Sequence, residues 1–191
     1  MTVSGCTLSG NSATFFGGGI DNGSIMTVSD STLSGNSSAY AGGGMVNFGT
    51  MQIRGSIFSN DSAAVLGGGI VNGNTMAISG CTLTGNSATK GAGIYNSNLH
   101  TLDVHGSTFS GNSASDSGGA IYNNLGTVTL QQSTLSGNTA GSAGGGIFNA
   151  ASGTLAVKDS TVFNNVAPLG ADIYNLGALT LDDSTVGVIG P

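Results

Sequence analysis

The chain has 191 residues, and its composition excludes several classes of protein before any motif is considered. Gly is abundant at 35 residues, while Pro occurs only 2 times and charged residues make up 6%, which argues against a disordered or collagen-like chain. The net charge is −6, every acidic residue is Asp, and Arg54, Lys90 and Lys158 are the only strong bases, so nucleic acid, an anionic membrane surface and a helix-rich fold are all disfavoured.

A repeat of about 25 residues runs through the whole chain. Each unit reads roughly as [LM]-x-[VIL]-x-[GD]-S-T-[LF]-S-G-N-S-A followed by G-G-[GA]-I-x-N, so three short alternations of apolar and polar residues are separated by turn residues. This pattern predicts an all-β fold: one single-stranded parallel β-helix over residues 1–191, with three strands per coil, seven full coils and a partial eighth. The units begin at Met1, Met26, Met51, Met76, Leu102, Val128, Leu155 and Leu179.

The N-terminal residues, MTVSGCTLSGNS, contain neither the basic region nor the long apolar region of a secretory signal. No apolar run is long enough for a transmembrane helix, so we expect no membrane insertion by this segment. Because neither end carries a recognisable cap, the chain is expected to be a segment of a longer protein. Its end coils would expose open β-edges, which predicts end-to-end self-association.

Stacking the coils turns each aligned column into a ladder, because equivalent residues lie one strand spacing apart. The aliphatic columns of the three strands are predicted to face inward and form the core; the third one is Ile20, Met45, Ile70, Ile94, Ile121, Ile147 and Ile173. Two Asn columns are predicted to bond along the axis at corners, and the Gly triplets are predicted to allow close approach there. The Asn columns are Asn11, Asn36, Asn86, Asn112, Asn138 and Asn165, with Asp61 in third place, and Asn22, Asn47, Asn72, Asn96, Asn123, Asn149 and Asn175.

The fifth unit, with TFSGNSA followed by GGAIYN, resembles the repeats of polymorphic outer-membrane proteins, whose marks are GGA[ILV] and FxxN. More broadly, the chain is similar to right-handed parallel β-helix proteins of the pectin-lyase-like superfamily. The resemblance implies a right-handed coil and a secreted or surface-displayed passenger of the autotransporter kind, often adhesive, so the expected location is extracellular or at the cell surface. The chain departs from the repeats in having Leu more often than Phe in the FxxN motif.

Cys6 and Cys81 share a column that is Ser in the other units. They lie three coils apart, well beyond the reach of a disulfide, so both are predicted to be free and inward-facing. A metal or redox role for the pair is therefore disfavoured, and no cofactor or metal site is predicted.

Asp103 and His105 lie two residues apart on the outward face of the first strand, where a carboxylate could orient an imidazole. Arg54 lies in the same column as His105, and Lys158 and Asp182 follow it. The superfamily's catalytic sites also lie on an outward strand face, but they use clustered Asp with basic residues. We therefore expect a binding site or a scattered polar surface here rather than catalysis.

Four aromatic residues follow one another on the outward side of the third strand: Tyr95, Tyr122, Phe148 and Tyr174. They predict an exposed stripe that either binds sugar rings or a partner or stiffens the sheet. Phe15, Phe16 and Tyr40, with Val65 and Leu66, predict a further apolar patch in the variable corner.

The second strand points Thr outward in most coils, with Ser two residues on, as in Thr108 and Ser110. This double hydroxyl column resembles the ice-contacting arrays of β-helical antifreeze proteins, although Ser lacks the methyl group of Thr. The function that we favour is a non-catalytic structural or adhesive module with a surface glycan or protein as partner. The alternatives are a carbohydrate-binding or carbohydrate-active β-helix and an ice-binding β-helix.

Overall fold

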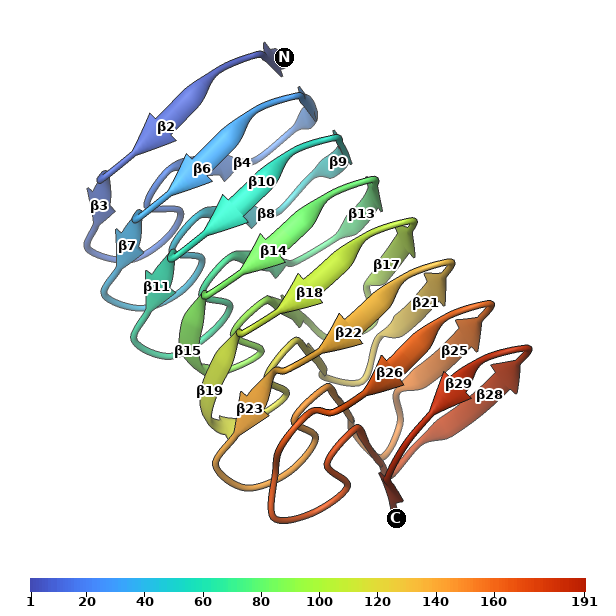
Figure 1. Ribbon diagram of the computed structural model, residues 1–191. Helices are drawn as coiled ribbons and strands as arrows, with labels where there is room; N and C mark the ends of the chain where they lie inside the picture. Colours follow the sequence, from blue (N-terminus) through green and yellow to red (C-terminus); the bar gives the residue numbers. More distant parts are fainter.

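A computed structural model describes residues 1–191 and contains strands but no helix. Figure 1 shows a chain that winds as successive coils from the N-terminus to the C-terminus, with equivalent strands stacked along one axis. All strand pairs within the four sheets are parallel and join equivalent residues of adjacent coils. The predicted parallel β-helix is confirmed.

The coil contains up to four strands, one more than the sequence predicts. The additional strand covers only two residues in most coils, as in Ser37–Ser38, which is too short to show a period of two. It lies directly after the first Asn corner and forms its own sheet of six strands. The three predicted strands of each coil are present, and this short strand is a fourth that the sequence did not indicate.

Sheets A and B carry the first two strands of each coil. Sheet A comprises β1 (Thr2–Ser4), β5 (Ile25–Ser29), β9 (Thr50–Arg54), β13 (Thr75–Ser79), β17 (Thr101–His105), β21 (Thr127–Gln131), β25 (Thr154–Lys158) and β28 (Ala178–Asp182). Sheet B comprises β2 (Thr7–Ser9), β6 (Thr32–Ser34), β10 (Ile57–Ser59), β14 (Thr82–Thr84), β18 (Thr108–Ser110), β22 (Thr134–Ser136), β26 (Thr161–Phe163) and β29 (Thr185–Val186).

Sheets C and D complete the coil. Sheet C comprises β3 (Ser12–Ala13), β7 (Ser37–Ser38), β11 (Ser62–Ala63), β15 (Ser87–Lys90), β19 (Ser113–Ser117) and β23 (Thr139–Ala140). Sheet D comprises β4 (Ile20–Asn22), β8 (Met45–Asn47), β12 (Ile70–Asn72), β16 (Ile94–Asn96), β20 (Ile121–Asn123), β24 (Ile147–Asn149), β27 (Ile173–Asn175) and β30 (Ile189–Gly190). The eighth coil has strands in sheets A, B and D alone, which agrees with the predicted partial coil.

The interior is an apolar core built from the predicted inward columns. Phe58 and Phe109 are the largest of its fully buried side chains, and the third-strand column from Met45 to Ile173 is 0% exposed. Because each strand alternates inward and outward residues, the outward positions carry most of the polar side chains. Burial of the inward apolar side chains contributes the main hydrophobic stabilisation of the coils.

The two predicted Asn ladders are confirmed. At the corner before sheet C, the Nδ2 of each Asn donates to the Oδ1 of the next member, as from Asn112 to Asn138 at 2.8 Å; Asp61 has no Nδ2 and does not make this bond. At the corner after sheet D, the same bond joins Asn123 to Asn149 at 2.7 Å. The first ladder ends at Asp172, whose Oδ1 accepts from Asn165 and whose Oδ2 accepts from the Val188 backbone.

A third ladder, of Ser hydroxyls, lies at the corner between sheets A and B. Here the backbone N–H of Ser107 donates to the Oγ of Ser133 at 3.1 Å, and each Oγ donates to the carbonyl two residues before it. Cys81 replaces one hydroxyl, and its Sγ accepts from the Ser56 N–H at 3.5 Å. Both cysteines are free, as predicted, but Cys6 is exposed because a neighbouring coil covers only one side of the first coil.

Close approach between coils limits the space at Gly119, the middle residue of the Gly-Gly-Ala segment in the fifth unit. A Cβ on Gly119 would collide with the carbonyl oxygens of Gly145 and Thr139, and backbone atoms cannot rotate away. Gly119→Ala is therefore expected to destabilise the protein by about 1–3 kcal/mol, measured by urea unfolding. Gly23→Ala is the control, because a Cβ there meets nothing within 4 Å. Equal urea midpoints for Gly119→Ala and Gly23→Ala would contradict the predicted collision at Gly119.

Candidate functional site

A shallow notch lies on the outer face of sheet A, across three adjacent coils. In the register of β9, β13 and β17, Gln52, Ala77 and Asp103 form one row, and Arg54, Ser79 and His105 form the next. Ala77 and Ser79 are short, so the space above them stays open between two longer pairs of side chains. These residues surround a hollow of about 280 Å³, which we call the sheet A notch.

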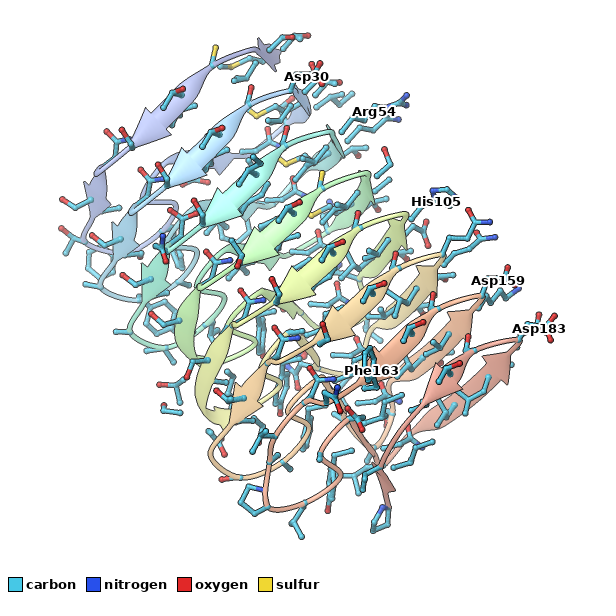
Figure 2. The ribbon with its side chains drawn as sticks, in the orientation of Figure 1. Asp30, Arg54, His105, Asp159, Phe163 and Asp183 are labelled. Carbon is cyan, nitrogen blue, oxygen red and sulfur yellow. The ribbon has the colours of Figure 1, made fainter.

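The four long side chains that border the sheet A notch are exposed and polar: Gln52, Arg54, Asp103 and His105. The Nη2 of Arg54 donates to the Oε1 of Gln52 at 3.2 Å, which holds these two side chains together on one wall. Figure 2 shows Arg54 and His105 extending outward from the same edge of the solenoid. Asp103 and His105 point outward as predicted and form the opposite wall.

Asp103 and His105 lie on the same wall of the sheet A notch but are not joined by a hydrogen bond. Lys158 and Asp182 are in the His105 column but lie two and three coils away. No group of three or more His, Cys, Asp or Glu side chains comes together where it could hold a metal ion.

The four aromatic residues of the third strand stack as predicted but are not an exposed platform. Ring centroids of Tyr122 and Phe148 lie 4.7 Å apart with an interplanar angle of 8°, and Tyr95 and Tyr174 extend the stack on either side. Tyr95 and Tyr122 are each only 8% exposed, and Phe148 and Tyr174 are half-buried. The prediction of an exposed stripe was therefore wrong.

The corner segments between sheets C and D cover this aromatic stack. Ala41, half-buried Leu66, Val46 and Val71 pack in one cluster with Tyr95 and Tyr122, as a second core outside sheet D. Burial, and after it the neighbouring Tyr122, raises the pKa of Tyr95 to about 12, so its hydroxyl stays protonated at neutral pH.

Lys90 covers the centre of the same stack. Its Nζ lies 5.3 Å from the centroid of the Tyr122 ring and 3.6 Å from the Oδ2 of Asp116. A cation held over an aromatic face and beside a carboxylate restricts access to that face. Lys90 therefore limits access to the ring face of Tyr122.

A different aromatic group is exposed, in the first two coils. The ring of Phe16 lies edge to face with Tyr40 at 5.8 Å and with Phe48 at 5.5 Å. Phe16 is 41% exposed, Tyr40 43% and Phe48 45%, and neighbouring Phe15 is 67% exposed. We call Phe16, Tyr40 and Phe48 the aromatic cluster.

Sequence reasoning found part of this cluster and missed Phe48. Phe48 comes from the turn after β8, whereas Phe16 and Tyr40 come from the corner before sheet D, so only the fold brings them together. One feature of the sequence could have indicated Phe48. The residue after the Asn of the second Asn column is Gly23 in the first coil and Gly73 in the third, but in the second coil it is the aromatic Phe48. Val65 and Leu66, which were grouped with the patch, are half-buried.

The outer face of sheet B carries the predicted Thr and Ser columns, in register from coil to coil. The Oγ of Ser110 donates to the Oγ1 of Thr84 at 3.2 Å, so some hydroxyls bond to one another. Ile57 and Phe163 interrupt the columns and are 42% and 38% exposed; Figure 2 labels Phe163 on this face. A second hollow, of about 420 Å³, is lined by Ser, Thr and Ala residues of β3, β7 and the residues that follow them, with no charged group.

One unit of the chain matches a known repeat. Residues 106–124 match the Chlamydia polymorphic membrane protein repeat. This match agrees with the resemblance of the fifth unit and points coarsely to a surface-protein module rather than to an enzyme family. A search of the curated proteins finds no match, and neither does a search of the solved structures. The structure contains no helix with the length and apolar character needed to cross a membrane.

The residues that carry the polymorphic membrane protein repeat have structural roles. Phe109 is fully buried, and Asn112 belongs to the first Asn ladder, which together account for the FxxN motif. In GGAI, Gly118 has φ of 71°, a left-handed conformation that favours Gly, and Ile121 is fully buried. The match therefore identifies a unit whose matched residues build the coil.

Proposed function

We propose that this chain is a non-catalytic β-helical module of a surface protein that binds a partner through side chains on its outside. The observation that carries the proposal is the aromatic cluster of Phe16, Tyr40 and Phe48, with Phe15 beside it. Exposed aromatic groups are enriched where proteins contact partners, because they bury a large apolar area with few rotatable bonds. The partner is proposed to be an extracellular protein or glycan.

The polymorphic membrane protein repeat at residues 106–124 supports a location at the cell surface. The architecture supports the proposed adhesive role, because a stack of coils presents many outward side chains along an extended surface. The scarcity of charge favours contact through aromatic and hydroxyl groups over long-range electrostatic attraction.

The test is a binding screen of the folded chain against a glycan array and a panel of extracellular matrix proteins. The triple variant Phe16→Ser, Tyr40→Ser, Phe48→Ser is expected to lose at least tenfold in affinity for whatever the parent binds, as aromatic anchors often contribute above 1 kcal/mol each. Phe163→Ser is the matched control, since it removes one exposed aromatic ring from sheet B. Unchanged binding by the triple variant would reject the aromatic cluster as the contact.

A carbohydrate-binding module is the second candidate, and the hydrogen-bonding groups of the sheet A notch are the observation in its support. Gln52, Asp103 and His105 offer hydrogen-bonding groups around a hollow of a size that suits a single sugar residue. In the same screen, glycan binding that the triple variant keeps would support this candidate, and binding to proteins alone would reject it. Turnover of any bound polysaccharide would overturn the non-catalytic proposal.

A further inference from the structure

The sheet A notch holds two opposite charges that have no ion-pair partner. The one ion pair in the structure joins Lys90 of β15 to Asp116 of β19, in sheet C and not in sheet A. Arg54 is the only Arg of the chain, and Asp103 is one of nine Asp residues. Both are exposed and border the same hollow.

The two charges stand at diagonally opposite corners of the sheet A notch. Arg54 and Asp103 lie two coils apart along the axis, which is about 10 Å, and two residues apart along the strand, which is about 7 Å. Their α-carbons are thus on the order of 12 Å apart. Ala77 and Ser79 form a low floor between them, so a ligand can reach both corners without steric obstruction.

We propose that the sheet A notch binds a segment of a partner protein that carries a carboxylate and a cationic side chain a few residues apart. The carboxylate of the segment pairs with Arg54, and its cationic group pairs with Asp103. Gln52, whose Oε1 already accepts from Arg54, keeps its amide N–H groups for the bound carboxylate. This inference rests on the proposed binding function but uses a surface separate from the aromatic cluster.

The composition of the sheet A notch favours this ligand over two other classes. A polyanion is disfavoured because Asp103 and the net charge of −6 repel it. A neutral saccharide is less favoured because no aromatic ring lines the hollow, and sugar rings gain much of their affinity from stacking on aromatic faces. A hollow of about 280 Å³ matches one or two side chains of a peptide.

The proposal is tested by NMR titration with blocked tripeptides, following the amide signals of Ala77 and Ser79. Acetyl-Glu-Gly-Lys-amide and acetyl-Lys-Gly-Glu-amide are compared with the neutral acetyl-Gln-Gly-Gln-amide and the singly charged acetyl-Glu-Gly-Gln-amide. We expect saturable shifts with at least one doubly charged peptide in the millimolar range, and weaker binding at 0.5 M salt. Arg54→Gln and Asp103→Asn are each expected to weaken that binding about two- to fivefold, as typical for exposed ion pairs.

Lys158→Gln and Asp182→Asn are the matched controls, because they remove the same charges from sheet A outside the notch. Equal binding of the neutral peptide, equal binding of the singly charged peptide, or no shift at 10 mM peptide would each overturn the proposal. Stronger shifts with a mixture of neutral and carboxylated oligosaccharides would also overturn it, in favour of a sugar site. The triple variant of the aromatic cluster should still show the peptide-induced shifts of Ala77 and Ser79. Failure of peptide binding at the sheet A notch can therefore be told apart from failure of partner binding at the aromatic cluster.

Discussion

Ile121→Asp is expected to unfold the central coils or to lower the free energy of unfolding by at least about 4 kcal/mol. Ile121 is fully buried in the core column of sheet D, between Ile94 and Ile147 of the adjacent coils. A carboxylate at this position would lose its hydration and find aliphatic side chains above and below. Since each coil is stabilised by its neighbours, the loss should spread to adjacent coils.

Thermal and urea unfolding, followed by circular dichroism, measure this effect. Ile121→Val is the control, because it keeps the apolar character and should cost about 1 kcal/mol. An Asp variant that melts like the parent would mean that Ile121 does not face the interior.

Asp61 is expected to make the protein less stable as the pH rises from about 4 to about 6. Its Oδ1 accepts from the backbone N–H and Nδ2 of Asn36, as an Asn would, but its Oδ2 is buried without a hydrogen-bond partner. The Oδ2 occupies the place where other ladder members have an Nδ2 that donates to the next Oδ1, here that of Asn86. A protonated carboxyl can donate in this place, whereas a carboxylate cannot.

The direction of the pH effect follows from the two pKa values of Asp61. Burial is the largest influence and raises the pKa of Asp61 from 3.8 to about 6, against the lowering effect of the bonds from Asn36. Below pH 4 the carboxyl is protonated in both the folded and the unfolded chain. Between pH 4 and 6 the folded chain keeps a proton that the unfolded chain has lost, so stability falls by about 2–3 kcal/mol and stays lower above pH 6.

Asp61→Asn should remove this pH dependence. The new Nδ2 can donate to Asn86 at any pH, so the variant is expected to exceed the parent by about 2–3 kcal/mol at pH 8 and to match it near pH 4. Urea midpoints measured from pH 3.5 to 8 provide the test. The complementary variant, Asn112→Asp, should show the same loss of stability above pH 6, since Asn112 occupies an equivalent position in the first Asn ladder. A parent protein whose free energy of unfolding rises between pH 4 and 6 would contradict the raised pKa of Asp61.

The repeat by itself determined the architecture of this protein. Apolar residues such as Ile94 and Ile121 recur at one position per unit, and in parallel coils such a column can only be an inward ladder. The Asn columns were predictable for the same reason, because identical side chains one strand spacing apart meet along the axis. The short strands of sheet C escaped prediction, since two residues carry no periodic signal.

The exposure of the outward residues was decided only by the tertiary structure. Tyr122 alternates outward from its strand, as the pattern indicates, yet a corner segment from a different part of the coil and Lys90 cover it. Phe48 reaches Phe16 from a turn that no local pattern connects to it. The sheet A notch likewise arises because short Ala77 and Ser79 lie between two longer pairs in adjacent coils. Periodicity specifies which side of the sheet a residue faces, but what covers that side depends on irregular segments whose paths only the folded chain defines.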